Sequence, residues 1–80
     1  MLSQLKNARK VVGVKQLRRA LADRTAAAVF LAKDADPALV QPLAQQCEEA
    51  GITPVWAESM QALGKACGIS VGAAAAAILR

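Results

Sequence analysis

The sequence contains no histidine and no tyrosine, and its aromatic residues are Phe30 and Trp56 alone. Without histidine the chain cannot form a Ser–His or Cys–His nucleophile pair, and a metal site would lack its commonest ligand. With so few aromatic rings, a surface that stacks successive bases of single-stranded RNA is also disfavoured. We therefore expect no enzyme activity, no cofactor and no metal site.

Cysteine is scarce, and long hydrophobic runs are missing. Cys47 and Cys67 lie in different apolar segments without CxxC spacing, which is typical of small buried side chains. The first ten residues, MLSQLKNARK, lack the apolar region of a secretory signal, and the longest apolar run covers residues 71–79. That run is much shorter than the ~20 residues of a membrane-spanning helix. We expect a soluble cytoplasmic monomer that makes no membrane contact.

Hydrophobic residues make up 55% of the 80 residues, enough for the tight aliphatic core of one domain covering residues 1–80. Charge is distributed unevenly. Residues 1–33 hold eight basic side chains and one acidic one, for a net charge of +7. Residues 34–80 hold two basic and five acidic side chains, for a net charge of −3. A strongly basic half indicates a surface for a polyanion.

Hydrophobic spacing in the first half predicts two helices and two strands. Leu2, Leu5 and Ala8 are spaced as in a short amphipathic helix. A brief strand at residues 11–12 ends at Gly13, and residues 14–23 then show helical spacing. The continuous apolar run AAAVFLA, residues 26–32, is typical of a strand buried on both faces.

The second half of the sequence is also predicted to alternate between helices and strands. Asp36 and Pro37 predict the start of a helix that ends at Gly51. We expect its apolar stripe to consist of four residues, Leu39, Leu43, Cys47 and Ala50. Residues 52–57 are predicted to form a strand, with Pro54 favouring a strand start or a sheet edge. Ser59 is the predicted cap of a helix over residues 60–67, which Gly68 ends.

The terminal stretch AAAAAIL, residues 73–79, fits two structures. Alanine has the highest helix propensity, whereas a short apolar segment after a strand–helix pattern fits a buried strand. We predict a strand, because helices that cover a sheet approach closely where its side chains are small. Helices and strands then alternate along the whole chain, which predicts an α/β sandwich around a small sheet.

The segment GVKQLRRAL, residues 13–21, is basic without an acidic residue. Lys15 and Arg19 are i,i+4 neighbours on one helix face, with Gln16 beside them. Cations in the first turn are unfavourable next to the helix dipole, and an anion bound there would reverse that effect. Gly13 would let a phosphate approach the backbone. The alternative is a basic face that is simply solvated.

Two further patterns have ordinary explanations. The glycines of LGKACGISVG match neither GxGxxG nor a P-loop, so a nucleotide-binding loop is disfavoured. Asp34 and Asp36 fit a turn residue and a helix cap, and no histidine or cysteine joins them and Glu58 in a metal or acid–base site. Ser59 has no base to activate it. Ile69 and Val71 would form an apolar contact surface if their glycine-flanked loop exposes them.

Three stretches, GVKQ, AKDADP and ESMQALGKACGISVGAAAAAIL, resemble the kink-turn RNA-binding family of ribosomal-protein-like domains, in particular its small bacterial YbxF-type members. The resemblance extends from about Lys6 to Leu79. It implies a three-layer α-β-α sandwich with a mixed four-stranded sheet. It also implies a function, the recognition of kink-turn RNA, a sharply bent internal loop with tandem sheared G·A pairs.

The resemblance assigns roles to residues of three segments. The start of the second helix would contact the G·A pairs and the adjoining backbone, through Gly13, Val14, Lys15, Gln16 and Arg19. The loop of Ile69, Ser70 and Val71 would cover a flipped-out nucleotide. Lys33 and Asp36 would lie at the rim. Arg18, in the same basic segment, completes the set of candidate RNA-binding residues.

One position departs from the pattern of archaeal and eukaryotic members, which usually carry Asn-Glu where this chain has Lys15-Gln16. Loss of the carboxylate removes an acceptor for guanine N–H groups, so the base contacts must differ in detail. YbxF-type members resemble this chain in having Lys-Gln. We therefore expect a partner that is kink-turn RNA, of ribosomal or regulatory origin. The alternative is a ribosome-associated protein-interaction module with a basic docking face.

Overall fold

The computed structural model describes the backbone of residues 2–80 and the side chains from residue 4 onward. Helices and strands alternate as predicted. In chain order the elements are η1 (Leu2–Leu5), β1 (Lys10–Val12), α1 (Val14–Ala22), β2 (Ala26–Ala32), α2 (Pro37–Glu49), β3 (Val55–Ala57), α3 (Met60–Ala66) and β4 (Ala75–Leu79). The first helix is a short 3₁₀ turn that ends before Ala8. Its Leu5 is buried, whereas the side chain of Leu2 lies outside the described residues.

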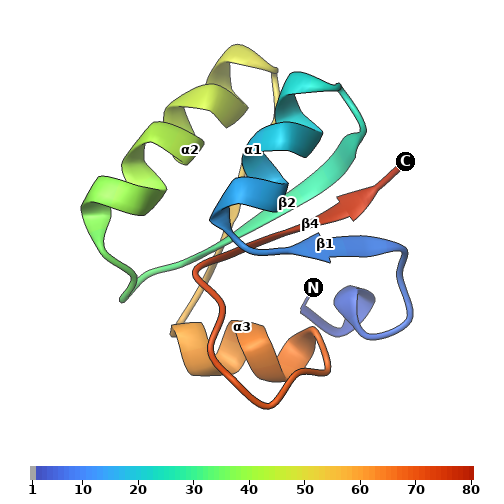
Figure 1. The fold of residues 1–80 in the computed structure, drawn as a ribbon, viewed down its shortest axis with the longest axis vertical. Coiled ribbons are helices and arrows are strands. Elements are labelled where there is room, and N and C mark those ends of the chain that lie inside the picture. The colour runs from blue at the N-terminus through green and yellow to red at the C-terminus, as the bar shows by residue number, and fades with distance from the viewer. Residues whose placement is uncertain (1) are drawn as a thin grey trace.

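One mixed sheet forms the middle layer, with strand order β1-β4-β2-β3. β4 runs antiparallel to both of its neighbours, β1 and β2, whereas β3 pairs with β2 in parallel. Helices α1 and α2 lie side by side on one face of the sheet, and α3 and η1 cover the other (Figure 1). The predicted three-layer α-β-α sandwich with a four-stranded sheet is confirmed.

The alanine-rich terminal stretch is the central strand β4, so the choice of strand over helix is confirmed. Ala75, Ala76 and Ala77 are completely buried between the two helical layers. Methyl side chains allow α1 and α3 to pack closely on opposite faces of the strand, and this close packing outweighs the intrinsic helix preference of alanine.

The predicted helix caps are also confirmed. The Asp36 carboxylate accepts a hydrogen bond from the Ala38 N–H at 2.9 Å, and the Ser59 hydroxyl accepts one from the Ala62 N–H at 3.0 Å. Gly51 follows α2 with a φ of 75°, the left-handed conformation expected at a helix end. These contacts place the starts of α2 and α3.

The predicted apolar stripe of α2 is wrong at both of its ends. Leu39 and Ala50 are exposed, and the buried residues are Val40, Leu43 and Cys47. The buried spacing of three and then four residues is as helical as the predicted one. Which spacing faces inward depends on how α2 packs against β2 and α1, and the local pattern does not determine that packing.

Cys47 in α2 and Cys67 after α3 are buried free thiols, as predicted. Burial raises the pKa of the Cys47 thiol. Burial also raises the pKa of Cys67, an effect that the positive charge of Lys10 partly opposes. Both side chains therefore act as small neutral hydrophobes at neutral pH.

Candidate nucleic-acid interface

Three segments that are distant in the sequence meet at one end of the sheet. β1, β2 and β3 finish there and β4 begins there, at the left of Figure 1. The Gly13 N–H donates to the Ala75 carbonyl at 2.8 Å, and the Ala32 N–H donates to the Ala74 carbonyl at 2.9 Å. The start of α1, the β2–α2 loop and the loop before β4 therefore form one continuous edge.

The start of α1 is a helix N-terminus without a side-chain cap. Gly13 occupies the N-cap position with φ 118° and ψ 155°, a conformation essentially restricted to glycine. Lys15 and Gln16 are exposed in the first turn, which contains no acidic residue, and Gln16 folds back so that its side-chain oxygen lies over Gly13. Unpaired backbone N–H groups and a cation thus share this turn.

Arg18 and Arg19 extend the basic surface along α1. Both are exposed, and the Arg19 side chain approaches Asp23 at 3.8 Å with 86% of its surface accessible. An ion pair that is so exposed contributes little to the stability of the fold, and the Arg19 guanidinium remains available to another anion. The Arg18 carbonyl accepts a long hydrogen bond from Gln46 of α2 at 3.4 Å, which links the two helices.

The loop between α3 and β4 presents the predicted apolar residues to solvent. Val71 is 68% exposed and Ile69 is 37% exposed, with Ser70 exposed between them. The backbone beneath them is held firmly. The Ile69 N–H donates to the Gly64 carbonyl at 3.1 Å, and a Cβ at position 64 would collide with the Val71 carbonyl oxygen. Val71 is thus exposed on an anchored loop.

Lys33 and Asp36 lie in the β2–α2 loop at the same end, and both interact with other groups there. Lys33 forms an ion pair with Glu58 at 3.0 Å, although both side chains are largely exposed. The Asp36 carboxylate caps α2. Their contribution to the edge is therefore structural as well as electrostatic.

Asp34 has a role that sequence reasoning missed. Its carboxylate accepts a 2.7 Å hydrogen bond from the N–H of Met60, the first residue of α3, 26 positions along the chain. The Met60 carbonyl in turn accepts from the Ala73 N–H at 3.0 Å. Asp34 therefore joins the β2–α2 loop to the base of the exposed apolar loop. The sequence signal was an acidic residue two positions after the end of a buried strand, which predicts only a turn.

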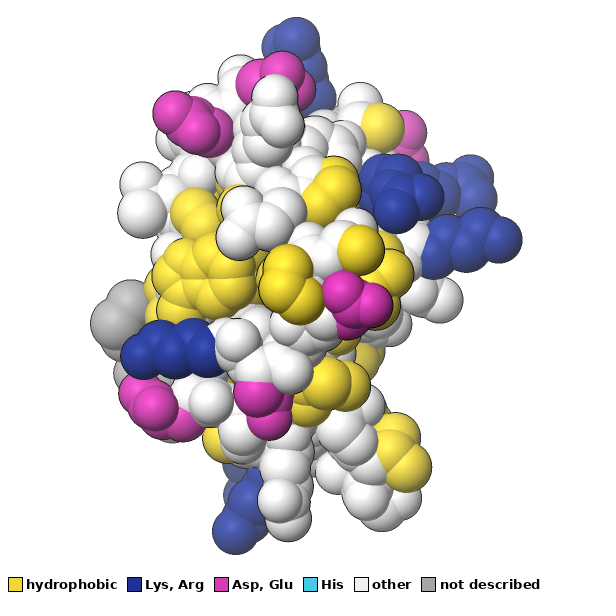
Figure 2. All heavy atoms as spheres, turned by 90° about the vertical axis from the view of Figure 1, so that its left-hand side faces the viewer, with side chains coloured by type: hydrophobic (Ala, Val, Ile, Leu, Met, Phe, Trp, Pro, Cys, Tyr) yellow, Lys and Arg dark blue, Asp and Glu magenta, His cyan; other side chains and the backbone are white. Residues whose placement is uncertain are grey.

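Figure 2 faces this end of the molecule. Hydrophobic side chains are scattered over the middle of the face, Lys and Arg side chains gather at the upper right with others at the top, lower left and bottom, and acidic groups are scattered among them. The described residues contain no group of three metal-ligating side chains, and no helix among residues 2–80 has the length and hydrophobicity needed to span a membrane. The edge thus combines positive charge, helix N–H groups and small apolar projections.

A family profile described as "Ribosomal protein L7Ae/L30e/S12e/Gadd45 family" matches residues 1–80. The chain belongs to this family. An RNA-binding protein of Geobacillus sp. (strain WCH70) is 45% identical over 95% of this chain and 93% of its own. "RNA-binding protein YbxF" of Geobacillus stearothermophilus is 46% identical over 88% of this chain and 85% of its own. The predicted resemblance to YbxF-type members of the L7Ae family is confirmed.

Two proteins of lower sequence identity are also similar to this chain. "Large ribosomal subunit protein eL8" of Haloquadratum walsbyi is 37% identical over 84% of this chain, which spans 57% of that protein. The solved structure of a Giardia lamblia 15.5kD RNA binding protein superposes with a TM-score of 0.89 at 32% identity, covering 99% of this chain and 70% of the other. The names of these relatives describe RNA-binding and ribosomal proteins rather than enzymes.

Proposed function

We propose that this protein binds RNA through the edge formed by the start of α1 and the loop before β4. Family membership and relatives named as RNA-binding proteins support this proposal. The local chemistry supports it as well. Lys15 is exposed in the first turn of α1, beside the helix N-terminus, an arrangement that favours phosphate, and Arg19 continues the exposed basic surface into the last turn of the helix. The chain acts without a cofactor or metal, and no catalytic role is assigned to any residue.

We further propose that the RNA is a kink-turn. The single observation that carries this specificity is the pairing of the basic start of α1 with the exposed apolar Val71 at one edge of the sheet. A kink forces phosphates of two RNA arms together, and a compact cluster of cations offsets their repulsion. Val71 and Ile69 supply an apolar surface for a base that the kink displaces from its stack. The protein then selects or induces the kinked state and holds it.

The Lys15-Gln16 pair sets the polar contacts available to the bases. A lysine ammonium donates hydrogen bonds but cannot accept one, whereas a glutamine amide does both. Gln16 is therefore the acceptor for guanine N–H groups in the first turn, and Lys15 contacts phosphate or a guanine carbonyl. The Gln16 side chain must rotate away from Gly13 to make that contact, since its oxygen lies over the glycine.

A gel-shift titration tests the specificity. The protein is titrated against a kink-turn RNA and against the same RNA with its G·A pairs replaced by Watson–Crick pairs. We expect much tighter binding to the intact kink-turn. Equal affinity for the two RNAs would show that the protein reads charge alone and would overturn the kink-turn assignment.

Substitutions at the edge test the mechanism. We expect Lys15→Ala or Arg19→Ala to weaken binding to the kink-turn by about 1–3 kcal/mol. Lys65→Ala removes an exposed lysine from α3 and serves as the charge-matched control, with little effect. Val71→Asp should weaken binding while the circular dichroism spectrum stays unchanged. Ile69→Asp tests the same loop less cleanly, because Ile69 is less exposed.

We also propose that the protein works as a cytoplasmic monomer on ribosomal or regulatory RNA. Affinity capture from cells, with and without ribonuclease, tests the nature of the partner. RNA-mediated partners are lost on digestion. Partners that survive digestion would indicate a protein-interaction module with a basic docking face. Size-exclusion chromatography coupled to light scattering measures the oligomeric state, for which we expect the mass of one chain.

A further inference from the structure

A second group of arginines lies at the end of the sheet opposite the proposed RNA-binding edge. Arg9 precedes β1, Arg24 follows α1 and Arg80 follows β4. The backbone brings the three segments together, because the Arg80 N–H donates to the Thr25 carbonyl at 2.8 Å and the Leu79 N–H donates to the Arg9 carbonyl at 2.8 Å. We name Arg9, Arg24 and Arg80 the distal arginine cluster.

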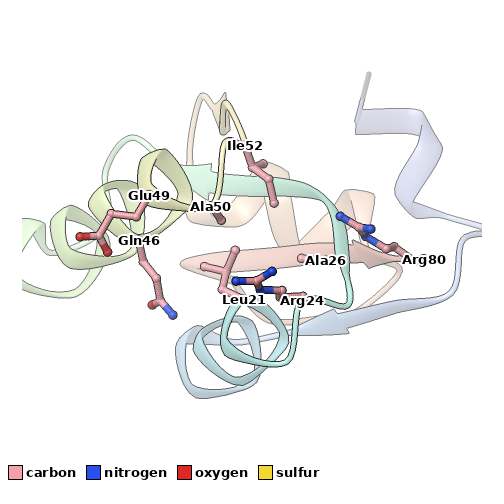
Figure 3. A pocket seen from close by; sticks show the side chains of 8 residues that line it. All are labelled: Leu21, Arg24, Ala26, Gln46, Glu49, Ala50, Ile52 and Arg80. Carbon is pink, nitrogen blue, oxygen red and sulfur yellow. The ribbon is translucent and has the colours of Figure 1, made fainter.

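Two members of this cluster line a pocket of about 520 Å³. Figure 3 shows Arg24 and Arg80 over an apolar floor that includes Leu21 and Ile52. Glu49 belongs to the opposite wall, and its carboxylate points away from both guanidinium groups (Figure 3). The arginine side of the pocket is therefore positive and open to an external anion.

Arg24 is the one non-glycine residue among residues 2–80 with a positive φ, 59°. It occupies the position after the Asp23 cap of α1, where its N–H donates to Leu21 and the next N–H, of Thr25, donates to Ala20. Glycine is the usual residue at this left-handed position, because a Cβ strains the backbone there. A favourable interaction with the helix dipole does not explain an arginine at position 24, because Arg19 already places a positive charge in the last turn of α1 without a left-handed backbone. The strained arginine therefore indicates a function for its side chain.

The distal arginine cluster has no acidic partner within the described chain. The ion pairs of residues 2–80 are Arg19–Asp23 and Lys33–Glu58. Asp23 is adjacent to Arg24 in the sequence but lies toward Arg19. Three guanidinium groups are thus left to solvent at one end of a protein whose net charge is +4.

We propose that the distal arginine cluster binds the phosphate backbone of a second RNA segment, so that the protein bridges two segments. This inference rests on the proposed RNA-binding function. The planar fork of a guanidinium matches phosphate oxygens, and backbone contacts need no base sequence. Among the side chains described from residue 4 onward, the exposed large hydrophobic ones, Leu39, Trp56, Ile69 and Val71, all lie outside the pocket. The apolar floor of the pocket offers no such exposed centre, because Leu21 is buried and Ile52 is partly buried, so RNA is favoured over an acidic protein.

The start of α1 and the distal arginine cluster lie at opposite ends of the sheet. β2 runs from one end of the sheet to the other with seven residues, a length of about 20 Å. A phosphate at the start of α1 and a phosphate at the distal arginine cluster are therefore too far apart to be neighbours in one strand. Two segments of a folded RNA, or two RNA molecules, would occupy the two ends.

A capture experiment tests the bridge. Kink-turn RNA is immobilised and loaded with protein, the loaded amount is measured, and a labelled RNA duplex without a kink is added at several salt concentrations. We expect the wild-type protein to retain the duplex and the variant with Arg9→Gln, Arg24→Gln and Arg80→Gln to load normally but lose it. The logarithm of the affinity falls as the logarithm of the salt concentration rises, and this dependence should become less steep by about 1 for each arginine removed. Arg24→Gln and Lys65→Gln form a matched pair, because each removes one positive charge, the first within the distal arginine cluster and the second away from it.

Arg24→Gly separates binding from folding. Glycine relieves the left-handed strain, so we expect a higher melting temperature together with weaker duplex retention. If Arg24→Gly retains the duplex as well as wild type, the strained arginine has no role in binding and the inference is wrong. Retention by the triple variant overturns it too. Capture of a glutamate-rich peptide in place of the duplex would also overturn it and indicate an acidic protein partner.

Failure of the kink-turn proposal gives a different result from failure of the bridge. If no protein loads onto the kink-turn RNA, the proposed function is wrong, and the duplex is then titrated directly with the free protein. Weaker binding by Arg24→Gln than by Lys65→Gln in that titration still supports the distal contact. Equal binding by the two variants overturns it.

Discussion

Position 13 requires a residue without a Cβ. Its φ of 118° and ψ of 155° lie where side chains are strained, and a Cβ would also displace the flexible end of the Gln16 side chain. We expect Gly13→Ala to lower the free energy of unfolding by about 1–3 kcal/mol, measured by urea denaturation. The same substitution should weaken RNA binding, because a backbone that relaxes from the left-handed conformation moves the N–H of position 13, which holds the start of α1 against β4.

Gly51→Ala is the matched control for that substitution. Gly51 also has a positive φ, 75°, but no atom lies near the site of a new Cβ. Gly51→Ala should lower the free energy of unfolding by about 1 kcal/mol, the usual penalty for an alanine in the left-handed conformation. Costs of equal size at positions 13 and 51 would contradict the special role assigned to Gly13.

At the scale of elements, the exposed apolar loop depends on the helix beneath it. Gly64 lies within α3, where alanine would ordinarily stabilise a helix by about 1 kcal/mol relative to glycine. Here a Cβ would overlap the Val71 carbonyl oxygen, so we expect Gly64→Ala to destabilise the protein by about 1–3 kcal/mol. The loop would shift, and RNA affinity should fall with it.

Thermal unfolding and gel-shift titration measure the two effects. Gln61→Ala, on the exposed side of α3, controls for a change of helix propensity and should alter neither quantity appreciably. An increase in stability for Gly64→Ala would show that the loop does not rest on this glycine.

Helices and strands could be predicted from the sequence because their signals are local. Asp36, Ser59 and Gly51 mark helix ends through contacts within a few residues, and the structure contains each of them. Asp34 shows where local reasoning fails. Its hydrogen-bond partner, Met60, is distant in the sequence, and only the assembled sheet brings the two together. The inward face of α2 was mispredicted for the same reason.

For the whole molecule, burial of the two thiols makes stability depend on pH. The pKa values of Cys47 and Cys67 are raised by burial above the ordinary value of 9.0. Above pH 9 the unfolded chain releases thiol protons that the folded protein retains, so the folded state binds more protons and loses stability as pH rises. The loss should reach about 1.4 kcal/mol per pH unit for each thiol.

Urea denaturation between pH 7 and pH 10.5 measures this dependence. The stabilising contribution of the protonated thiols is fully present below pH 9 and is lost above it. A variant with Cys47→Ala and Cys67→Ala should be less stable throughout but should show a shallower decline above pH 9. Parallel declines in the two proteins would show that other groups cause the alkaline loss.

The distribution of charge over the whole molecule was only partly predictable. The sequence indicates a basic half, and the structure divides its cations between the two ends of the sheet. Lys15 lies in the first turn of α1 and Arg19 in its last turn, whereas Arg9 and Arg24 lie at the far end of the sheet. Their separation follows from strand directions, which composition does not contain. The left-handed backbone of Arg24 is likewise invisible in the sequence, since the usual glycine is absent.

The position of β4 also sets the order in which this protein matures during synthesis. Among the strands of these 80 residues β4 is the last to be made, yet it lies between β1 and β2, which are made first. Until β4 leaves the ribosome, β1 has no neighbouring strand, and the Gly13 N–H has no Ala75 carbonyl to meet. A nascent chain without β4 therefore lacks the backbone contact that holds the start of α1 at this edge of the sheet.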